Sequence, residues 1–284
     1  MQVFEIGRIN RLVIKKIDAQ GAWLASELGP ILLPEVECPS GIRPEDRIEV
    51  FVYRGKDNSL VATLQRPRAQ VGEFALLQVR QVTKHGAFLD WGLEKDLLVP
   101  HTEQTEKMLE GRSYLVKVCR DSANRVVGTA KIERCLETEK VDLQPGQEVD
   151  LIIWKFTDLG AKVIVDHLYE ALIYRDQLGS GLKRGDHLKG YVDRIRTDKK
   201  VDVSLQKGGA EGIDVAKQVI MTALAESMFL PLHDKSSPAA IQQALGLSKK
   251  LFKKALGGLY REGLVELTPT GIKVKNVRSP NDAQ

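Results

Sequence analysis

The sequence is poor in cysteine, in aromatic side chains and in long apolar runs. It has 284 residues, of which three are cysteine and 6% are aromatic. Cys38, Cys119 and Cys135 are odd in number and have no C-x-x-C spacing, which argues against a disulfide framework and against a cysteine-rich zinc site. We therefore expect reduced thiols in a cytosolic protein. No apolar run approaches the roughly 18 residues of a membrane span, and Glu5 and Arg8 interrupt any export signal at the start.

A strong excess of charge and the motifs of common enzyme classes are also absent. The chain carries 42 basic and 38 acidic side chains, a formal net charge of +4, which alone neither indicates nor excludes a polyanionic partner. There is no phosphate-cradling glycine loop, no nucleophile elbow and no H-E-x-x-H string. The histidines lack metal-ligand spacing and the carboxylates do not cluster. We predict no catalytic residue, no metal site and no cofactor.

Internal repeats are the main positive signal. Three glycine pairs are each separated by fourteen residues: Gly7 with Gly21, Gly72 with Gly86, and Gly146 with Gly160. Each pair is followed by an apolar segment, then by alternating strand-like stretches, and then by a β-rich stretch with Thr or Ser. The apolar segments are ILLP at 31–34, LLVP at 97–100 and ALIY at 171–174. This threefold order of features predicts a repeated module.

The pattern within each module predicts a small β barrel. Period-two alternation and turn clusters indicate about five short strands in roughly 70 residues. Such strands cannot form a sandwich of two broad sheets and close most economically into a Greek-key barrel. The paired glycines fit this geometry, since tightly coiled strands need corner positions without a Cβ. The alternative is one large β domain with accidental periodicity.

The last quarter of the chain follows a helical pattern. After a glycine-rich joint, apolar side chains recur with the helical period over 214–228. Ser237 and Ser248 are placed to begin two further helices, the first of which ends near Gly246. A hairpin with the turn TPTG at 268–271 follows. The order helix, helix, basic helix, hairpin is typical of a winged helix, a variant of the helix-turn-helix.

Three strings carry a resemblance to a known family. HGAFLDWGLEKDLLVP at 85–100 is similar to the strand-two and strand-three signature of the S1 RNA-binding domain, an OB-fold barrel, and VGEFALLQV at 71–79 and KVDVSLQ at 200–206 add to the likeness. Over about residues 1–275, the order of modules resembles the CvfB family (conserved virulence factor B and YitL-like proteins). The resemblance implies three S1 modules ahead of a winged helix, and a bacterial regulator of gene expression that acts on RNA.

We therefore predict a mainly β chain of three tandem S1-like OB-fold barrels, each of five strands, followed by an α+β winged-helix domain. The predicted boundaries are 1–68, 69–138 and 139–209 for the barrels, 210–275 for the winged helix and 276–284 for a flexible tail.

An OB-type barrel binds single strands by stacking bases on aromatic rings and by following the backbone with cations. In the S1 pattern, stacking positions lie two residues after the second-strand glycine and just before that glycine. The later position holds Trp23, Phe88 and Lys162, and the earlier one holds Gln20, His85 and Leu159. Trp23 and Phe88 are the best stacking candidates, with core packing as the alternative, and His85 is a weaker one. Trp91 and Trp154 are assigned to a barrel interior or a module interface.

The third module has lysine where a ring is expected, but it offers other rings in Phe156, Tyr169, Tyr174 and Tyr191. Residues 183–207 hold eight cations against four acids, the densest basic stretch of the chain. From this module, the residues predicted to bind RNA are Phe156, Lys162, Tyr174, Arg175, Lys189, Tyr191, Arg194, Arg196 and Lys199.

The last helix has four lysines off its apolar face: Lys249, Lys250, Lys253 and Lys254. They form either the solvated side of the helix or a phosphate-binding face. Residues 211–284 hold ten basic and seven acidic side chains, so three of the four net positive charges lie there. Together with the third barrel, these lysines predict one continuous basic surface for RNA.

The predicted function is that of a cytosolic, non-catalytic regulator that binds single-stranded RNA through its barrels and its basic winged helix. One alternative is a DNA-binding transcription regulator in which the winged helix reads duplex DNA and the barrels are a scaffold or a protein-interaction arm. Another is an adaptor for the ribosome or for a protein. No membrane partner is expected, and the lack of heptads and of a broad apolar surface stretch favours a monomer.

Overall fold

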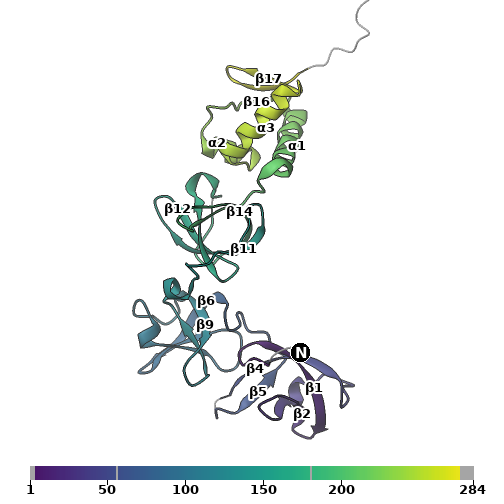
Figure 1. Ribbon diagram of the computed structural model, residues 1–284, viewed down its shortest axis with the longest axis vertical. Coiled ribbons are helices and arrows are strands. Elements are labelled where there is room, and N and C mark those ends of the chain that lie inside the picture. Colours follow the sequence, from purple (N-terminus) through teal and green to yellow (C-terminus); the bar gives the residue numbers. More distant parts are fainter. Residues whose placement is uncertain (1–3, 56, 180, 276–284) are drawn as a thin grey trace, which may run out of the picture. The chain divides into compact units, whose positions relative to one another are not determined.

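The computed structural model describes residues 4–55, 57–179 and 181–275, and it is mainly β (Figure 1). The chain divides into two compact units, residues 1–136 and 137–284. The first unit holds two five-stranded barrels, and the second holds a third barrel and a winged helix. The predicted fold class is confirmed. The predicted flexible tail, 276–284, lies outside the described residues.

Each barrel consists of five short strands in the same order along the chain. The first has β1 (Ile9–Asp18), β2 (Gly21–Leu24), β3 (Ile31–Pro34), β4 (Arg47–Arg54) and β5 (Leu60–Thr63). The second has β6 (Phe74–Thr83), β7 (Gly86–Asp90), β8 (Leu97–Pro100), β9 (Ser113–Arg120) and β10 (Val126–Thr129). The third has β11 (Glu148–Phe156), β12 (Gly160–Val165), β13 (Tyr169–Tyr174), β14 (His187–Ile195) and β15 (Val201–Ser204).

Strand pairing closes the first and third sets of strands into barrels and leaves the second nearly closed. In the first and third barrels, the third strand pairs in parallel with the fifth, which completes the ring in the orders β1-β2-β3-β5-β4 and β11-β12-β13-β15-β14. In the second barrel the order is β10-β9-β6-β7-β8, and no ladder joins β8 to β10 within the described residues. There the side chains of Leu97 and Val99 fill the space beside Gly128.

The repeated glycines occupy equivalent corners, as the spacing predicts. The second glycine of each pair begins the second strand with φ near the mirror-image β region, +133° at Gly21, +145° at Gly86 and +150° at Gly160. A Cβ at Gly160 would overlap the backbone oxygen of Ile173 in the adjacent strand. A side chain is therefore excluded on two grounds, backbone conformation and close approach of the next strand.

The two barrels of the first unit share a hydrophobic core. Phe51 and Tyr53 point outward from β4 and pack among buried residues of the second barrel that include Trp91. The rings of Phe51 and Trp91 meet edge to face, with centroids 5.6 Å apart and planes at 82°. Trp91 is 2% exposed, which confirms its predicted place in an interior or interface. The Lys95 ammonium also donates to the Arg54 carbonyl at 2.8 Å.

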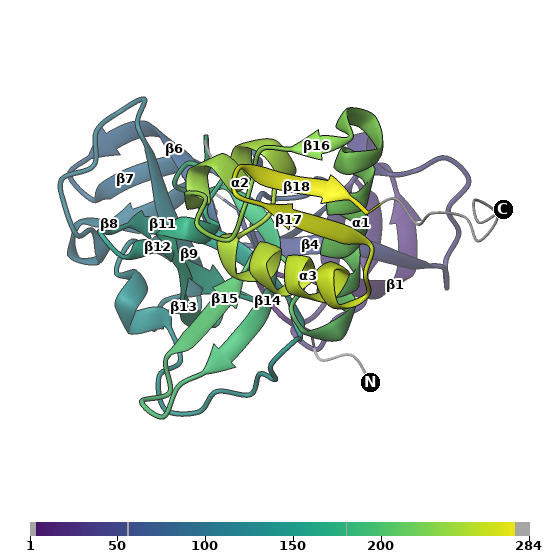
Figure 2. The ribbon, with the colours of Figure 1, turned by 90° about the horizontal axis from the view of Figure 1, so that it is seen from above.

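The last domain contains α1 (Gly209–Ser227), α2 (Pro238–Leu245) and α3 (Lys249–Arg261), followed by the hairpin of β17 (Val265–Thr268) and β18 (Gly271–Val274). The hairpin lies alongside α3 (Figure 2). The hydroxyls of Ser237 and Ser248 cap α2 and α3 as predicted, accepting backbone N–H groups at 3.2 and 3.4 Å. A short strand that was not predicted, β16 (Phe229–Leu230), pairs with β18.

Candidate nucleic-acid interface

Strand pairing defines one outward-facing row of side chains on each barrel, here called the outward row. Residues directly opposite one another on neighbouring strands share a face of the sheet, so the register identifies the row. In the first barrel it is Lys16, Trp23, Leu32, Val61 and Tyr53. In the second it is Gln81, Phe88 and Leu98, with Val127 and Cys119 at the equivalent positions of β10 and β9. In the third it is Lys155, Lys162, Leu172, Asp202 and Arg194.

The outward row of the first barrel is accessible over β1, β2 and β3. Trp23 is half-buried, and its indole Nε1 donates to Asp18 Oδ2 at 2.9 Å. The Lys16 ammonium lies 2.8 Å from the same carboxylate oxygen, and its hydrogen bond is the main cause that lowers the pKa of Asp18. At the other end of the row, Tyr53 is buried against the second barrel. The first barrel thus presents one fixed ring beside one cation.

The outward row of the second barrel also presents a ring. Phe88 is half-buried between Gln81 and Leu98, and Ala87 and Leu89 on either side of it are buried. The predicted alternation, which places Trp23 and Phe88 opposite core residues, is confirmed. His85 is exposed in the turn between β6 and β7. Burial raises the pKa of Cys119 to about 11, so this thiol in the row is protonated at neutral pH.

The outward row of the third barrel replaces the ring by an ionic cluster. Lys162 lies over the ring of Trp154, 5.3 Å from its centroid, and pairs with Glu170 at 2.9 Å. Asp202, which lies between Leu172 and Arg194 in the row, is only 1% exposed. It accepts hydrogen bonds from Arg194 Nε at 2.6 Å and from Arg196 Nε at 3.0 Å.

This cluster holds two guanidinium groups in place. Arg196 Nη2 donates to the hydroxyl of Tyr174 at 2.8 Å, so Arg196 is bound on two sides. Burial by itself would raise the pKa of Asp202, but the hydrogen bonds and charges of Arg196 and Arg194 outweigh it and lower that pKa. The carboxylate is therefore ionised at neutral pH, and it holds two arginines whose side chains are 61% exposed at Arg194 and 29% exposed at Arg196.

The other residues predicted for the third barrel do not all join this row. Phe156 pairs with the core residue Ala161, so its ring lies on the interior side at the barrel end, where it is 47% exposed. The expectation that Tyr169 supplies a binding ring is wrong, because Tyr169 is 7% exposed and packs in the core. Trp154, at 8% exposure, is buried as predicted.

Three of the residues predicted for RNA binding on the third barrel already have partners in the protein. Lys189 pairs with Asp150 at 2.8 Å, and the hydroxyl of the half-buried Tyr191 donates to Glu148 at 3.3 Å. Lys199 donates to a backbone carbonyl, that of Glu139, at 2.7 Å. Arg175 is exposed on the short 3-10 helix η4 (Arg175–Gln177), which follows β13.

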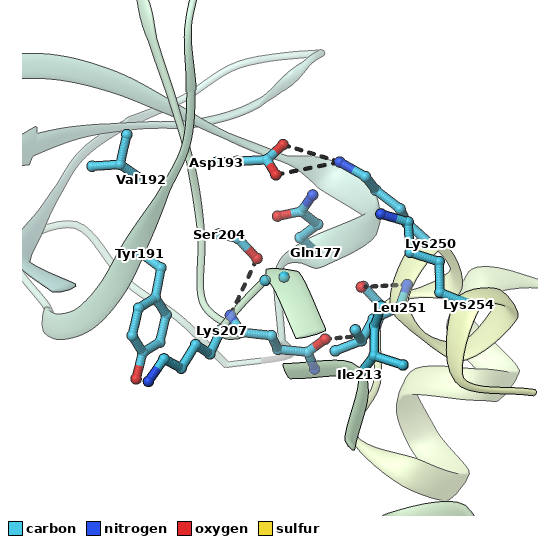
Figure 3. Close-up of a pocket in the computed structure, with 14 residues that line it drawn as sticks. Gln177, Tyr191, Val192, Asp193, Ser204, Lys207, Ile213, Lys250, Leu251 and Lys254 are labelled. Carbon is cyan, nitrogen blue, oxygen red and sulfur yellow. Dashed lines mark hydrogen bonds and ion pairs between the residues drawn. The ribbon is translucent and has the colours of Figure 1, made fainter. Parts of the chain in front are cut away.

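The four lysines of α3 have different environments. Lys250 pairs with Asp193 of β14 at 3.1 Å, and Lys249 is half-buried. Lys253 and Lys254 are exposed, and over residues 4–55, 57–179 and 181–275 neither has a carboxylate at ion-pair distance. Lys250 and Lys254 line a small pocket between α3 and the third barrel (Figure 3). The predicted basic surface is thus interrupted by acids that neutralise part of its charge.

Other residues of the interface were not found from the sequence. Leu32, Leu98 and Leu172 form the apolar centre of the three outward rows. Their signal is visible in hindsight, because each occupies the second position of the apolar third-strand segment in its module. Asp202 and Lys155 gave no comparable signal, because only the strand register places them beside Arg194 and Lys162.

Two further features of the described part of the chain concern other kinds of site. No group of three or more His, Cys, Asp or Glu side chains there could hold a metal ion. No helix in the same residues is both long and apolar enough to cross a membrane.

Comparisons with known proteins agree with this architecture. A family model of the S1 domain matches residues 6–65 and 71–131, and one of the CvfB-like winged helix domain matches 218–274. The chain is 27% identical to YitL of Bacillus subtilis strain 168 over 255 residues, covering 86% of this chain and 85% of YitL. It is 25% identical to Conserved virulence factor B of Staphylococcus epidermidis over 244 residues, covering 80% and 82%.

A solved structure of a multidomain protein with nucleic acid binding domains from Streptococcus pneumoniae aligns with 95% of this chain and 98% of that one, at 23% identity and a TM-score of 0.41. The S1 and winged-helix matches support nucleic-acid binding and are consistent with a protein that is not an enzyme. With S1 modules, a further barrel of the same strand order and a CvfB-like winged helix, the chain belongs to the CvfB family, together with YitL and conserved virulence factor B.

Proposed function

We propose that this protein binds single-stranded RNA without catalysing a reaction and acts in the cytoplasm as a post-transcriptional regulator of gene expression. The observation that carries the proposal is the outward row, which recurs on all three barrels. In the first two barrels it presents Trp23 and Phe88 as half-buried rings. A ring that is held by the protein on one side and open on the other is the platform on which unpaired bases stack.

The second unit supplies the electrostatic part of this binding. Its outward row has cations in place of rings, with Arg194 and Arg196 held by Asp202. The same unit carries Lys253 and Lys254 on α3. Cations that follow a phosphate backbone add affinity without base preference. Stacking on the first unit and phosphate contacts on the second would act on one strand together, and their linkage in one chain raises the effective concentration of each.

The surface of α3 favours a single strand over duplex DNA. Base-edge reading in a major groove uses Asn and Gln for adenine and Arg or Lys for guanine. The exposed positions of α3 from Lys250 to Arg261 include no amide side chain, so a reader of adenine is missing from this helix. The N-terminal part of α3 is also turned toward the third barrel, where Lys250 pairs with Asp193 (Figure 3).

The proposal is tested by titrating the full chain with labelled single-stranded RNA and with duplex DNA at several salt concentrations. Trp23→Ala and Phe88→Ala are each expected to weaken RNA binding by about 1–3 kcal/mol, because one stacking partner is lost. The salt dependence should not change, since no phosphate contact is removed. Lys253→Ala combined with Lys254→Ala should instead lower the slope of log K against log salt by about 0.7 per lost contact.

Arg112→Ala is a suitable control, because Arg112 is an exposed cation in a turn away from the outward rows. It should bind RNA like the unchanged protein. Thermal unfolding of each variant verifies that the fold is retained. Preference for duplex DNA that depends on residues 213–275, or the absence of RNA binding, would contradict the proposal.

A further inference from the structure

A mostly apolar groove lies between α1 and α2 on the winged helix, and α3 does not contribute to it. Its volume is about 360 Å³. Val215, Val219 and Leu245 are its largest apolar side chains, and Glu226 is the single charged residue among the described residues that line it. Cations attract a phosphate backbone, so a groove whose one charge is negative is unsuited to nucleic acid.

The groove is bordered by a second apolar face of α1. Ile220 and Leu224 lie on the first face and are buried in the core of the domain. Val215, Val219 and Glu226 line the groove, and steps of four and seven residues return to nearly the same side of a helix. The stripe from Val215 to Glu226 is about 16 Å long at 1.5 Å per residue. Since Val215 is 54% exposed, α1 presents a straight apolar wall of three turns to the solvent.

The opposite wall belongs to a surface helix without charge. The eight residues of α2 are proline, alanine, isoleucine, glutamine and leucine, although Ala239, Gln243 and Ala244 are exposed. The solvated side of a surface helix ordinarily carries charged residues, whereas charge is depleted at the centre of protein interfaces. The composition of α2 is therefore that of a surface that a partner covers.

Glu226 gives this surface its sign. It lies in the last turn of α1, which contains no basic residue. The C-terminal end of a helix has a negative potential, so a carboxylate there is unfavourable for the helix itself. The other two acids exposed on α1 pair with lysines, Glu211 with Lys207 and Asp214 with Lys217. Among the described residues, Glu226 has no cation at ion-pair distance, and a cation from a partner would meet both its carboxylate and the helix end.

The walls also restrict the shape of the partner. The backbone groups of α1 and α2 are bonded within their own helices, so they offer no edge to which an extended peptide could add as a strand. A straight stripe with steps of three and four residues is the surface on which another helix packs.

We propose that the groove between α1 and α2 is a docking site for an amphipathic helix of a partner protein. The apolar face of that helix covers Val215, Val219 and Leu245, and its Lys or Arg pairs with Glu226. This site goes beyond the proposed function and does not depend on RNA binding.

The test uses the full chain as bait and a displayed library of random peptides of about 18 residues, a length at which helices form, as the probe. Selection should enrich peptides that have apolar residues at steps of three and four and a basic residue near one end. Selection of no peptide, or of acidic peptides or peptides without the helical spacing, would overturn the proposal.

One selected peptide is then synthesised, labelled and titrated with variants. Val215→Asp should weaken its binding by about tenfold or more, because a charge replaces a buried apolar contact. Val36→Asp is the matched control, since Val36 is a 93% exposed valine of the first barrel, and it should bind like the unchanged protein. Equal binding by all three proteins would show that the peptide occupies another site and would overturn the assignment.

Charge reversal tests the role of Glu226 separately. Glu226→Lys should weaken binding of the basic peptide, and a peptide with glutamate at its basic position should prefer this variant to the unchanged protein. The substitution does not destabilise α1, because a cation is favourable at a helix C-terminus. If the two peptides do not exchange their preference, Glu226 does not pair with the partner and the proposed sign of the partner is wrong.

Two other occupants give distinct results. A dimer of the unchanged protein in sedimentation velocity that Val215→Asp dissociates would assign the groove to a second copy of the chain. An RNA affinity that Val215→Asp lowers as much as Trp23→Ala would assign it to the nucleic-acid interface. Either result overturns the docking of a partner protein, whereas absence of RNA binding by the unchanged protein overturns only the proposed function.

Discussion

Replacing Asp202 by asparagine is expected to weaken RNA binding, although it removes a negative charge from a surface that binds phosphates. Asp202 lies in the outward row of the third barrel, beside Arg194, and is almost fully buried. It accepts hydrogen bonds from Arg194 at 2.6 Å and from Arg196 at 3.0 Å. Asparagine has the same shape but lacks the charge and has only one acceptor oxygen. Asp202→Asn therefore frees two side chains that the native protein holds.

Two opposing effects set the magnitude. Removing one negative charge about 7 Å from a phosphate favours binding by roughly 2.4 kcal/mol at the effective dielectric constant of about 20 that applies in and near a protein. Each released arginine must be ordered again when RNA binds, at a cost of up to about 2 kcal/mol in rotamer entropy. With the full cost for both arginines, the net effect is a loss of roughly 1–2 kcal/mol, or about five- to thirtyfold in affinity.

The assay is fluorescence anisotropy with a labelled single-stranded RNA at constant salt, with thermal unfolding to confirm that the variant is folded. Asp198→Asn is the matched control. Asp198 is half exposed and pairs with Lys200 at 3.2 Å, so its removal changes charge without releasing the two arginines. We expect slightly tighter binding for Asp198→Asn and weaker binding for Asp202→Asn. Tighter binding by both would show that Asp202 acts only as a charge, and the positioning role would be refuted.

Three further expectations concern stability. Because the pKa of Asp202 is lowered in the folded protein, its carboxylate stabilises the fold above the unfolded value of about 3.9, and this contribution is lost as the pH falls through the lowered pKa. As the pH falls below about 4, the free energy of unfolding measured in urea should thus decrease more for the unchanged protein than for Asp202→Asn. Equal pH dependence of this free energy in the two proteins would contradict the lowered pKa of Asp202. Gly160→Ala should cost at least about 2 kcal/mol, because φ is +150° and the next strand blocks the Cβ, whereas Gly257→Ala should gain about 0.5–1 kcal/mol. If urea unfolding shows that both substitutions lower the free energy of unfolding, or that both raise it, this expectation is contradicted. Phe51→Ala should cost about 3–5 kcal/mol and raise hydrogen exchange in both barrels of the first unit, because the ring belongs to their shared core. Faster exchange in the first barrel alone would show that the two barrels unfold independently.

The barrels and the winged helix were predictable because their signals are local. A glycine at φ +150°, an alternation such as Ala22, Trp23, Leu24, or a serine that caps a helix depends on neighbours within a few residues. The same reasoning correctly places Trp23 on the outside of its barrel. It fails for Tyr169, because the strand register and the packing of the barrel interior decide which tyrosine is buried.

The sequence by itself determined the number and type of modules, the faces of their strands and the abundance of basic residues toward the C-terminus. Only the tertiary structure decided which of those charges remain available. Lys250 is neutralised by Asp193, fifty-seven residues away, whereas Lys253 and Lys254 in the next turn are not. The physical reason is range: backbone conformation follows from adjacent residues, but an ion pair forms only where folding brings two distant side chains within about 4 Å.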